Sequence, residues 1–478
     1  KPIWRMKDAN VTYIAADTET KTDVNAGSQS ANGMTVLNIG IHTPDVATPG
    51  PMSSCGSPSL VDYKNHKVGL SVNLKESVKV RDVKFCFRFT NVKVKVAVPK
   101  WMPAFSTPGV PGQTKHILRG ISGTVHSGQV LAIIGASGSG KTTLLDQLSL
   151  MPMMPGGKMT GRVEVNGCPV SQAFFKSKCA YVNQDDRLWG ALTVFENLEI
   201  ASKLYEPKLS SIKRRGKIEE VLRATGLLSC QQTKVGNALI KGISGGQRRR
   251  VSIAVELMGS PAILFLDEPT SGLDSKSAAE IMQLLGLLAK DLNVLIICSI
   301  HQPSSRTFFA FDLILLLSKG RACYFGPAND SVGYFAKRGF QAPPNMNPAD
   351  FLIEISNPDF TEKSQVDRLI LEWETFYSEE LKNSDEKKLG EAYEETEEPE
   401  MYASGLAWQV WVLVHRMALS YMRDPGAYIG RAVLYVTMSI IFGVIYVGAE
   451  REQEHVLDYL FAIAWGMATP SYMAVSAG

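Results

Sequence analysis

Residues 131–145 read L-A-I-I-G-A-S-G-S-G-K-T-T-L-L, and this stretch decides the fold. The apolar run at 130–134 predicts a buried strand, and a glycine-rich turn leads from it into an apolar helical start. The spacing G-x-x-x-x-G-K-T is that of a phosphate-binding loop, in the strand–loop–helix order that such a loop requires. Glycines let successive backbone N–H groups converge on one anion, and the helix start adds a positive dipole end. The stretch therefore predicts nucleotide binding.

The loop offers three kinds of group to a nucleotide: backbone N–H groups, a charge and a hydroxyl. Lys141 would reach the β- and γ-phosphates, and the Thr142 hydroxyl would bind Mg²⁺. The predicted cofactor-binding residues of the loop are Gly135, Ala136, Ser137, Gly138, Ser139, Gly140, Lys141, Thr142 and Thr143.

Composition limits the possible partners and the compartment. The chain has 478 residues, enough for two or three domains, and its net charge of +3 gives no indication of nucleic-acid binding. Its seven cysteines form no C-x-x-C pair and no zinc spacing, which favours reduced thiols in a cytosolic domain. The chain starts without methionine and stops inside an apolar run, so we expect a fragment of a longer protein.

Composition also divides the soluble part into three segments. Residues 1–75 are rich in Ser, Thr, Asn, Gly and Pro, and are predicted to be a disordered N-terminal extension. Strands and helices alternate over 76–356, which predicts an α/β domain with a mainly parallel sheet. Residues 357–403 are highly charged, above all in E-A-Y-E-E-T-E-E-P-E, and are expected to form a solvated linker.

The remaining residues have membrane character. Residues 404–425 are amphipathic, and we expect a helix at the membrane interface; a helix packed on the soluble domain is the alternative. Residues 427–478 contain two long uncharged runs, which predict two transmembrane helices rather than a buried globular hairpin. Arginines precede the first run and acidic residues follow it, so the nucleotide domain is expected in the cytosol.

Polar residues follow three further predicted strands: Gln184, the pair Asp267 and Glu268, and His301. Ligand chemistry in a parallel sheet belongs at the carboxyl ends of strands, so these side chains should converge. Asp267 would hold Mg²⁺ with Thr142, and Glu268 would orient or deprotonate the attacking water. A helix-capping carboxylate is the alternative for Glu268, and a structural histidine is the alternative for His301.

The phosphate loop, Gln184, S-G-G-Q at 244–247, L-D-E-P-T-S-G-L-D at 266–274 and His301 together resemble the nucleotide-binding domain of an ABC transporter. S-I-H-Q-P-S-S-R, N-P-A-D-F and a nucleotide domain placed before the membrane domain resemble the G-subfamily half-transporters. The resemblance covers residues 76–478. It implies an α/β P-loop NTPase domain followed by the start of an all-α transmembrane domain of ABC-2 type, interrupted after two helices.

The resemblance also implies roles for single residues, with ATP and Mg²⁺ as cofactors. The predicted catalytic residues are Glu268, His301, Gln184 and Lys141, and the predicted metal-binding residues are Thr142, Gln184 and Asp267. His301 would contact the γ-phosphate, and Gln184 would link the metal and water to movement of the membrane domain. Ser244, Gly245, Gly246 and Gln247 of one subunit would close over ATP held by the other, with Asp274 communicating across the interface.

The expected activity is therefore ATP-driven export of lipids, sterols or other amphipathic compounds by a multi-pass membrane protein. Its partners would be the lipid bilayer and a second half-transporter subunit, in a homodimer or heterodimer. A soluble ABC-type ATPase in translation or repair is the alternative, and a catalytically silent regulatory subunit is a third reading. Many relatives stack adenine on an aromatic residue where an ungapped match places Val94, so weak ATP/GTP discrimination is also expected.

Overall fold

The computed structural model describes residues 85–97, 114–153, 156–237, 240–384, 402–423 and 425–445, with Leu460, Phe461 and Ala464. All of them belong to one compact unit, Val68–Gly478. The predicted N-terminal extension and nearly all of the second predicted transmembrane helix lie outside the described residues.

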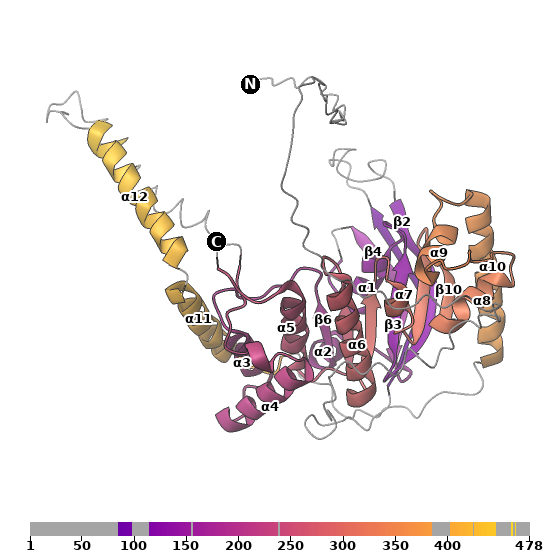
Figure 1. The fold of residues 1–478 in the computed structure, drawn as a ribbon, viewed down its shortest axis with the longest axis horizontal. Helices are drawn as coiled ribbons and strands as arrows, with labels where there is room; N and C mark the ends of the chain where they lie inside the picture. The colour runs from indigo at the N-terminus through magenta and orange to yellow at the C-terminus, as the bar shows by residue number, and fades with distance from the viewer. Residues whose placement is uncertain are drawn as a thin grey trace, which may run out of the picture. The chain divides into compact units, whose positions relative to one another are not determined.

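A six-stranded sheet forms the centre of the nucleotide domain (Figure 1). Its order is β10-β9-β3-β8-β7-β6, and all neighbours pair in parallel except β10 with β9. The strands are β3 (Val130–Gly135), β6 (Cys179–Val182), β7 (Ile263–Leu266), β8 (Leu295–Ser299), β9 (Leu313–Ser318) and β10 (Arg321–Pro327). Every residue of β3, β7 and β8 is buried, as a parallel sheet covered on both faces requires. The predicted mainly parallel α/β sheet is confirmed.

A second, antiparallel sheet has the order β2-β1-β4-β5. Its strands are β1 (Cys86–Ala97), β2 (Thr114–His126), β4 (Gly157–Val165) and β5 (Cys168–Pro169). Buried and exposed residues alternate along β1, β2 and part of β4, so one face lies in the core and the other faces solvent. Asn166 (φ 50°) and Gly167 (φ 81°) form the tight turn between β4 and β5.

Aromatic side chains of β1 join the two sheets. The Phe87 ring meets Phe265 of β7 edge-on at 6.0 Å, and the Phe89 ring meets Phe325 of β10 at 6.3 Å. Gly123 of β2 makes this approach possible, because a Cβ there would lie 2.5 Å from Cζ of Phe89.

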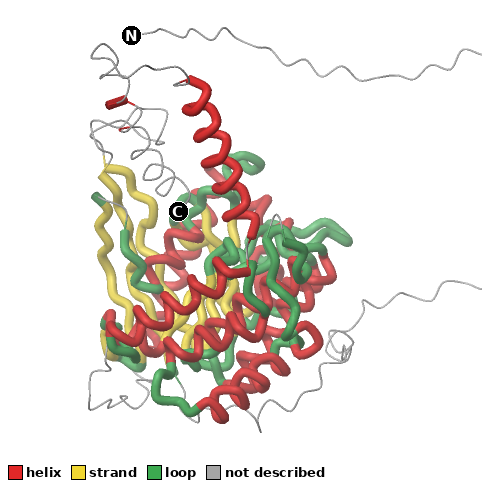
Figure 2. Tube along the Cα trace, turned by 90° about the vertical axis from the view of Figure 1, so that its left-hand side faces the viewer, coloured by secondary structure: helices red, strands yellow, loops and turns green. Residues whose placement is uncertain are grey.

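Helices follow the strands and cover the central sheet (Figure 2). They are α1 (Lys141–Leu148), α2 (Gln172–Lys178), α3 (Val194–Tyr205), α4 (Ser211–Ala224), α5 (Gly245–Leu257), α6 (Ser275–Leu292), α7 (Ser305–Phe308), α8 (Ser331–Ala336) and α9 (Pro348–Ser356), then α10 (Lys363–Ser384), α11 (Leu406–Arg423) and α12 (Pro425–Ile445). Single 3₁₀ turns span Leu228–Cys230 and Ala328–Asp330.

The linker prediction for 357–403 is wrong in its first half, where α10 packs against β10. Four apolar side chains of α10 are buried: Val366, Leu369, Ile370 and Trp373. They recur at three- and four-residue spacing and so form one helical stripe. The surrounding charge concealed this stripe in the sequence. Residues 385–401 lie outside the described chain.

α11 packs on α3. Val412 is buried between Leu192 and Ile200, and Arg423 Nη1 donates to Glu196 Oε2 at 2.6 Å. Along this stripe the helix follows the alternative interpretation, a helix packed on the nucleotide domain. Its other side chains include Trp411, which is 53% exposed, and contact with a membrane interface stays a prediction.

α12 is helical over most of the first predicted transmembrane run. Within the described ranges, none of the helices is both long enough and apolar enough to cross a bilayer. The two transmembrane helices therefore stay predictions.

Replacing Phe89 by alanine should weaken the packing between the two sheets. The side chain is fully buried, and its loss should lower the free energy of unfolding by about 3–5 kcal/mol, measured by urea denaturation. Phe360, which is 77% exposed, is the matched control. Its alanine variant should change the free energy by less than about 0.5 kcal/mol, and equal effects at both positions would contradict the role of Phe89.

Candidate nucleotide site

The predicted site residues follow four strands that lie side by side in the order β3, β8, β7, β6. The phosphate loop follows β3 and His301 follows β8, while Asp267 and Glu268 follow β7 and Gln184 follows β6. Strand order thus brings residues more than 100 positions apart in sequence to one edge of the sheet. This is the edge at which open α/β sheets bind ligands.

Lys141 lies folded against its own loop. Its side chain is buried, and Nζ donates hydrogen bonds to the carbonyls of Gly135 at 2.9 Å and Ala136 at 3.1 Å. Burial lowers the pKa of Lys141, and the carboxylates of Glu268 and Asp267 act in the opposite direction. A phosphate could replace the two carbonyls as partner of this ammonium group, so the donor fits an anionic ligand.

The loop needs glycine at two positions. Gly138 and Gly140 have φ angles of 76° and 103°, a region that other residues rarely occupy. A Cβ on Gly140 would also lie 2.8 Å from Cδ2 of Leu118. The start of α1 is therefore held close to β2, with its first N–H groups directed into the loop.

Asp267 is the centre of a hydrogen-bond network at the ends of β7 and β8. Its Oδ1 accepts from Ser299 Oγ at 2.5 Å and from Thr142 Oγ1 at 3.3 Å. Ser299 Oγ in turn accepts from the backbone N–H of Glu268 at 2.9 Å. Thr142 and Asp267 present a hydroxyl and a carboxylate oxygen side by side, the hard oxygen ligands that Mg²⁺ takes together with phosphate and water.

Glu268 and Gln184 are also in contact. Gln184 Nε2 donates to Glu268 Oε2 at 3.0 Å, which joins the end of β6 to the end of β7. Glu268 has a φ of 43°, a left-handed conformation that costs energy for a residue other than glycine. Such strain is typical of side chains that must point into a site.

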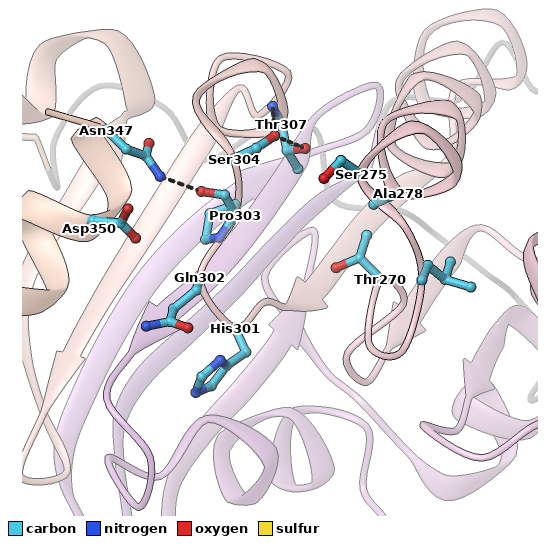
Figure 3. A pocket seen from close by; sticks show the side chains of 11 residues that line it. Thr270, Ser275, Ala278, His301, Gln302, Pro303, Ser304, Thr307, Asn347 and Asp350 are labelled. Carbon is cyan, nitrogen blue, oxygen red and sulfur yellow. Dashed lines mark hydrogen bonds between the residues drawn. The ribbon is translucent and has the colours of Figure 1, made fainter. Parts of the chain in front are cut away.

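His301 lies apart from these contacts. It is exposed and lines an open cavity of about 450 Å³ together with residues of α6, α7 and α9. Figure 3 shows His301 and Gln302 on the loop after β8, between Asn347 and Asp350 on one side and Thr270 on the other. Within the described chain, His301 makes no hydrogen bond to the phosphate loop or to Glu268.

The predicted second anion site forms at the starts of α5 and α6. Ser244 Oγ accepts from the N–H of Gln247 at 3.3 Å, and Gln247 Oε1 accepts from the N–H of Ser244 at 3.0 Å. Gly246 packs on Ser277, whose N–H donates to Asp274 Oδ2 at 3.2 Å. Ser244–Gln247 and Asp274 are therefore neighbours, and their side-chain hydrogen bonds stay within these two helix starts.

The sequence interpretation missed Arg249. Its side chain is only 4% exposed, and it donates hydrogen bonds to the carbonyls of Asp267 at 2.8 Å and Pro269 at 3.2 Å. It also donates to Asn183 O at 2.5 Å and to Gln184 O and Asp186 Oδ1 at 3.2 Å each. One guanidinium thus fixes the backbone around both Gln184 and Glu268.

One signal could have found Arg249. It lies three residues after Gly246 and four before Ile253, and both of these are buried on the core-facing side of α5. A second missed contact joins α1 to β6, where Tyr181 OH donates to Asp146 Oδ1 at 2.8 Å. Burial raises the pKa of the Asp146 carboxyl, and the hydrogen bond from Tyr181 lowers it.

The placement of Val94 at an adenine-stacking position is wrong. Val94 faces the core of the antiparallel sheet and is only 1% exposed. Val96, two residues further on the same face, is half-buried at the rim of the strand. It is also aliphatic, so β1 offers no aromatic ring at that rim.

The chain is similar in sequence to known proteins. Residues 118–271 match the ABC transporter family and residues 301–399 match the ABC-2 type transporter family. The chain is 34% identical to ABC transporter G family member 12 of Dictyostelium discoideum over 369 residues, 75% of this chain and 56% of that protein. The chain belongs to the ABC transporter family.

Two further relatives support the same family assignment. It is 35% identical to ABC transporter G family member 7 of Arabidopsis thaliana, over 72% of this chain and 49% of that protein. It is 43% identical to ATP-binding cassette sub-family G member 8 of Rattus norvegicus, over 52% of this chain and 36% of that protein. The chain thus spans about half the length, or less, of these relatives.

Among solved structures, cbiO1 from Clostridium perfringens, part of the ABC transporter complex cbiONQ, aligns with a TM-score of 0.40 and 25% identity. The alignment covers 52% of this chain and 92% of cbiO1. The family assignment rests on the sequence matches.

Arg249→Lys should destabilise this edge of the sheet. Lysine keeps the charge but has at most three donors, so buried carbonyls at the ends of β6 and β7 would lose their partners. The free energy of unfolding should fall by about 1–3 kcal/mol, measured by urea denaturation. Arg250→Lys, one residue along α5, is the matched control, and a similar loss there would show that the five hydrogen bonds are not the cause.

Proposed function

We propose that this chain is the ATP-binding and ATP-hydrolysing subunit of a membrane exporter. The observation that carries the proposal is the contact of Gln184 with Glu268 beside the network of Asp267, Ser299 and Thr142. A carboxylate that can accept a proton therefore lies next to a pair of oxygens suited to a cation, at the end of β7, which is separated from the strand of the phosphate loop by β8 alone.

Each residue then has a definite task in hydrolysis. Lys141 leaves the carbonyls that it now contacts and binds the β- and γ-phosphates. Thr142, Asp267 and Gln184 would hold Mg²⁺, whose charge would offset that of the phosphates. Glu268 orients the attacking water or accepts its proton. His301, exposed at the end of β8, contacts the γ-phosphate once nucleotide is present.

A second subunit completes the site. Ser244 and Gly245 are exposed at the start of α5, and the positive dipole end of such a helix start attracts an anion. In a homodimer or heterodimer, Ser244–Gln247 of one subunit would cover ATP held by the other, with Asp274 at the interface. Binding of two ATP molecules favours the closed pair and hydrolysis reverses this preference.

Closure reaches the membrane through α3 and α11. The chain runs from Gln184 through residues 185–193 into α3, and α3 holds α11 through the ion pair of Glu196 with Arg423. α11 leads into α12 and the predicted transmembrane residues 427–478, so the domain moves the membrane part from the cytosolic side. The transported compound is proposed to be a lipid, a sterol or another amphipathic molecule.

The alternatives have less support. A soluble ATPase of translation or repair would not need the match to the ABC-2 type transporter family. A catalytically silent subunit would not need Glu268 in contact with Gln184.

Glu268→Gln tests the proposed hydrolysis. The amide cannot accept a proton, so ATP turnover should fall by about 10²–10⁴-fold while ATP binding is retained. Sedimentation of the variant with ATP and Mg²⁺ should show a dimer with trapped nucleotide. Glu219→Gln on α4 is the control and should hydrolyse ATP normally. Normal phosphate release from Glu268→Gln, or a monomer that retains ATP, would refute the proposal.

Competition between ATP and GTP tests the base site. Since Val96 supplies no aromatic ring, the ~0.5–1.5 kcal/mol of an aromatic stack is missing, and we expect inhibition constants within about tenfold of each other. Val96→Tyr should tighten binding of both nucleotides. A strong preference of the unaltered chain for ATP would refute the prediction.

A further inference from the structure

One face of the antiparallel sheet carries cations that the nucleotide site does not use. We name it the cationic face and define it by six exposed side chains of β1, β2 and β4: Lys93, Lys95, His116, Arg119, Lys158 and Arg162. The three strands contain a single acidic residue, Glu164, which lies opposite Arg88 in the strand register rather than opposite any of the six.

Strand register brings these side chains together. Lys93 lies opposite Arg119, and Lys95 lies opposite His116 on one side and Lys158 on the other. Directly opposed residues project from the same face of a sheet, and like charges placed so are destabilising. In the part of the chain that the structure describes, none of the six forms an ion pair. An anion bound across the array would offset this repulsion.

The chain itself contains a matching anion. Residues 391–400, E-A-Y-E-E-T-E-E-P-E, hold six glutamates and no lysine or arginine. We propose that the cationic face binds this acidic segment of the same chain.

Both neighbours of the acidic segment are anchored beside the antiparallel sheet. Before it, α10 packs on β10 with the rings of Trp373 and Tyr324 5.4 Å apart, and β10 touches β2. After it, Lys176 Nζ donates to Tyr402 OH at 2.9 Å, and Lys176 belongs to α2, which follows β5. β2 and β5 are the two edges of this sheet. The segment therefore connects α10, which packs on the strand that touches edge β2, to α2, which begins three residues after edge β5 and packs on β6.

The chain is long enough to cross the face. The 18 steps from Ser384 to Tyr402 can span up to about 60 Å when extended. Four strands spaced at ~4.8 Å make a sheet only about 15 Å wide. Because the segment is tethered at both ends, its effective concentration at the face is on the order of millimolar.

Zero-length carbodiimide crosslinking of the full chain in neutral-lipid nanodiscs tests the proposal. Mass spectrometry should find amide links from Lys93, Lys95 or Lys158 to glutamates of the acidic segment. The links should weaken in about 1 M salt, where the screening length is ~3 Å. Changing the six glutamates to glutamine should abolish the links and make acetylation of the three lysines several-fold faster.

A matched pair of variants separates location from total charge. Lys93→Glu, Lys95→Glu and Lys158→Glu together should release the segment. The same change at the exposed Lys208, Lys213 and Lys337 should leave the links intact. Lysines in place of the six glutamates, combined with the first triple variant, should restore crosslinking with the charges exchanged.

Three outcomes would overturn the proposal. The first is an absence of links together with equal acetylation rates of the three lysines in the unaltered chain and in the glutamine variant. The second is links that form only between isotope-labelled and unlabelled chains, which would assign the face to a second copy. The third is protection of the lysines that requires phosphatidylserine and persists in the glutamine variant, which would make the bilayer surface the occupant. None of these measurements requires ATP hydrolysis, so they are independent of the proposed function.

Discussion

A buried guanidinium holds the nucleotide edge of this domain together. The ends of β6 and β7 are irregular, so their carbonyls cannot be satisfied by the sheet, and buried carbonyls need partners. Arg249 supplies four hydrogen bonds to these carbonyls and a fifth to the Asp186 carboxylate, all from α5, which itself begins with the predicted anion site at Ser244. Movement of α5 therefore cannot leave Gln184 and Asp267 unaffected. The helix proposed to cover the ATP of a partner subunit is therefore hydrogen-bonded to the residues that carry this subunit's own site.

Much of this arrangement follows from the sequence, because strand order and turn chemistry are local signals. The apolar run before Gly135 and the one before Asp267 have no other stable place than a covered parallel sheet. Asn166-Gly167 specifies its tight turn because both residues tolerate a positive φ. The convergence of Gln184 with Glu268 then follows from topology, although the hydrogen bond between them does not.

What the sequence did not reveal depends on contacts between distant residues. The helical spacing of Arg249 from Gly246 and Ile253 indicates the core-facing side of α5, but its hydrogen-bond partners at the ends of β6 and β7 do not follow from that spacing. The apolar stripe of α10 was hidden by its charged neighbours, and Val94 needed a strand register to show which way it faces. A net charge of +3 likewise conceals the cationic face, because the acidic run at 391–400 cancels it in the total.

The close approach of Gly123 to Phe89 constrains how this protein can diverge. A single Cβ at residue 123 would collide with the ring, while a smaller side chain at residue 89 would leave a void between the sheets. A substitution at either position alone therefore disturbs the packing between the two sheets, so the side chains tolerated at residues 89 and 123 depend on each other.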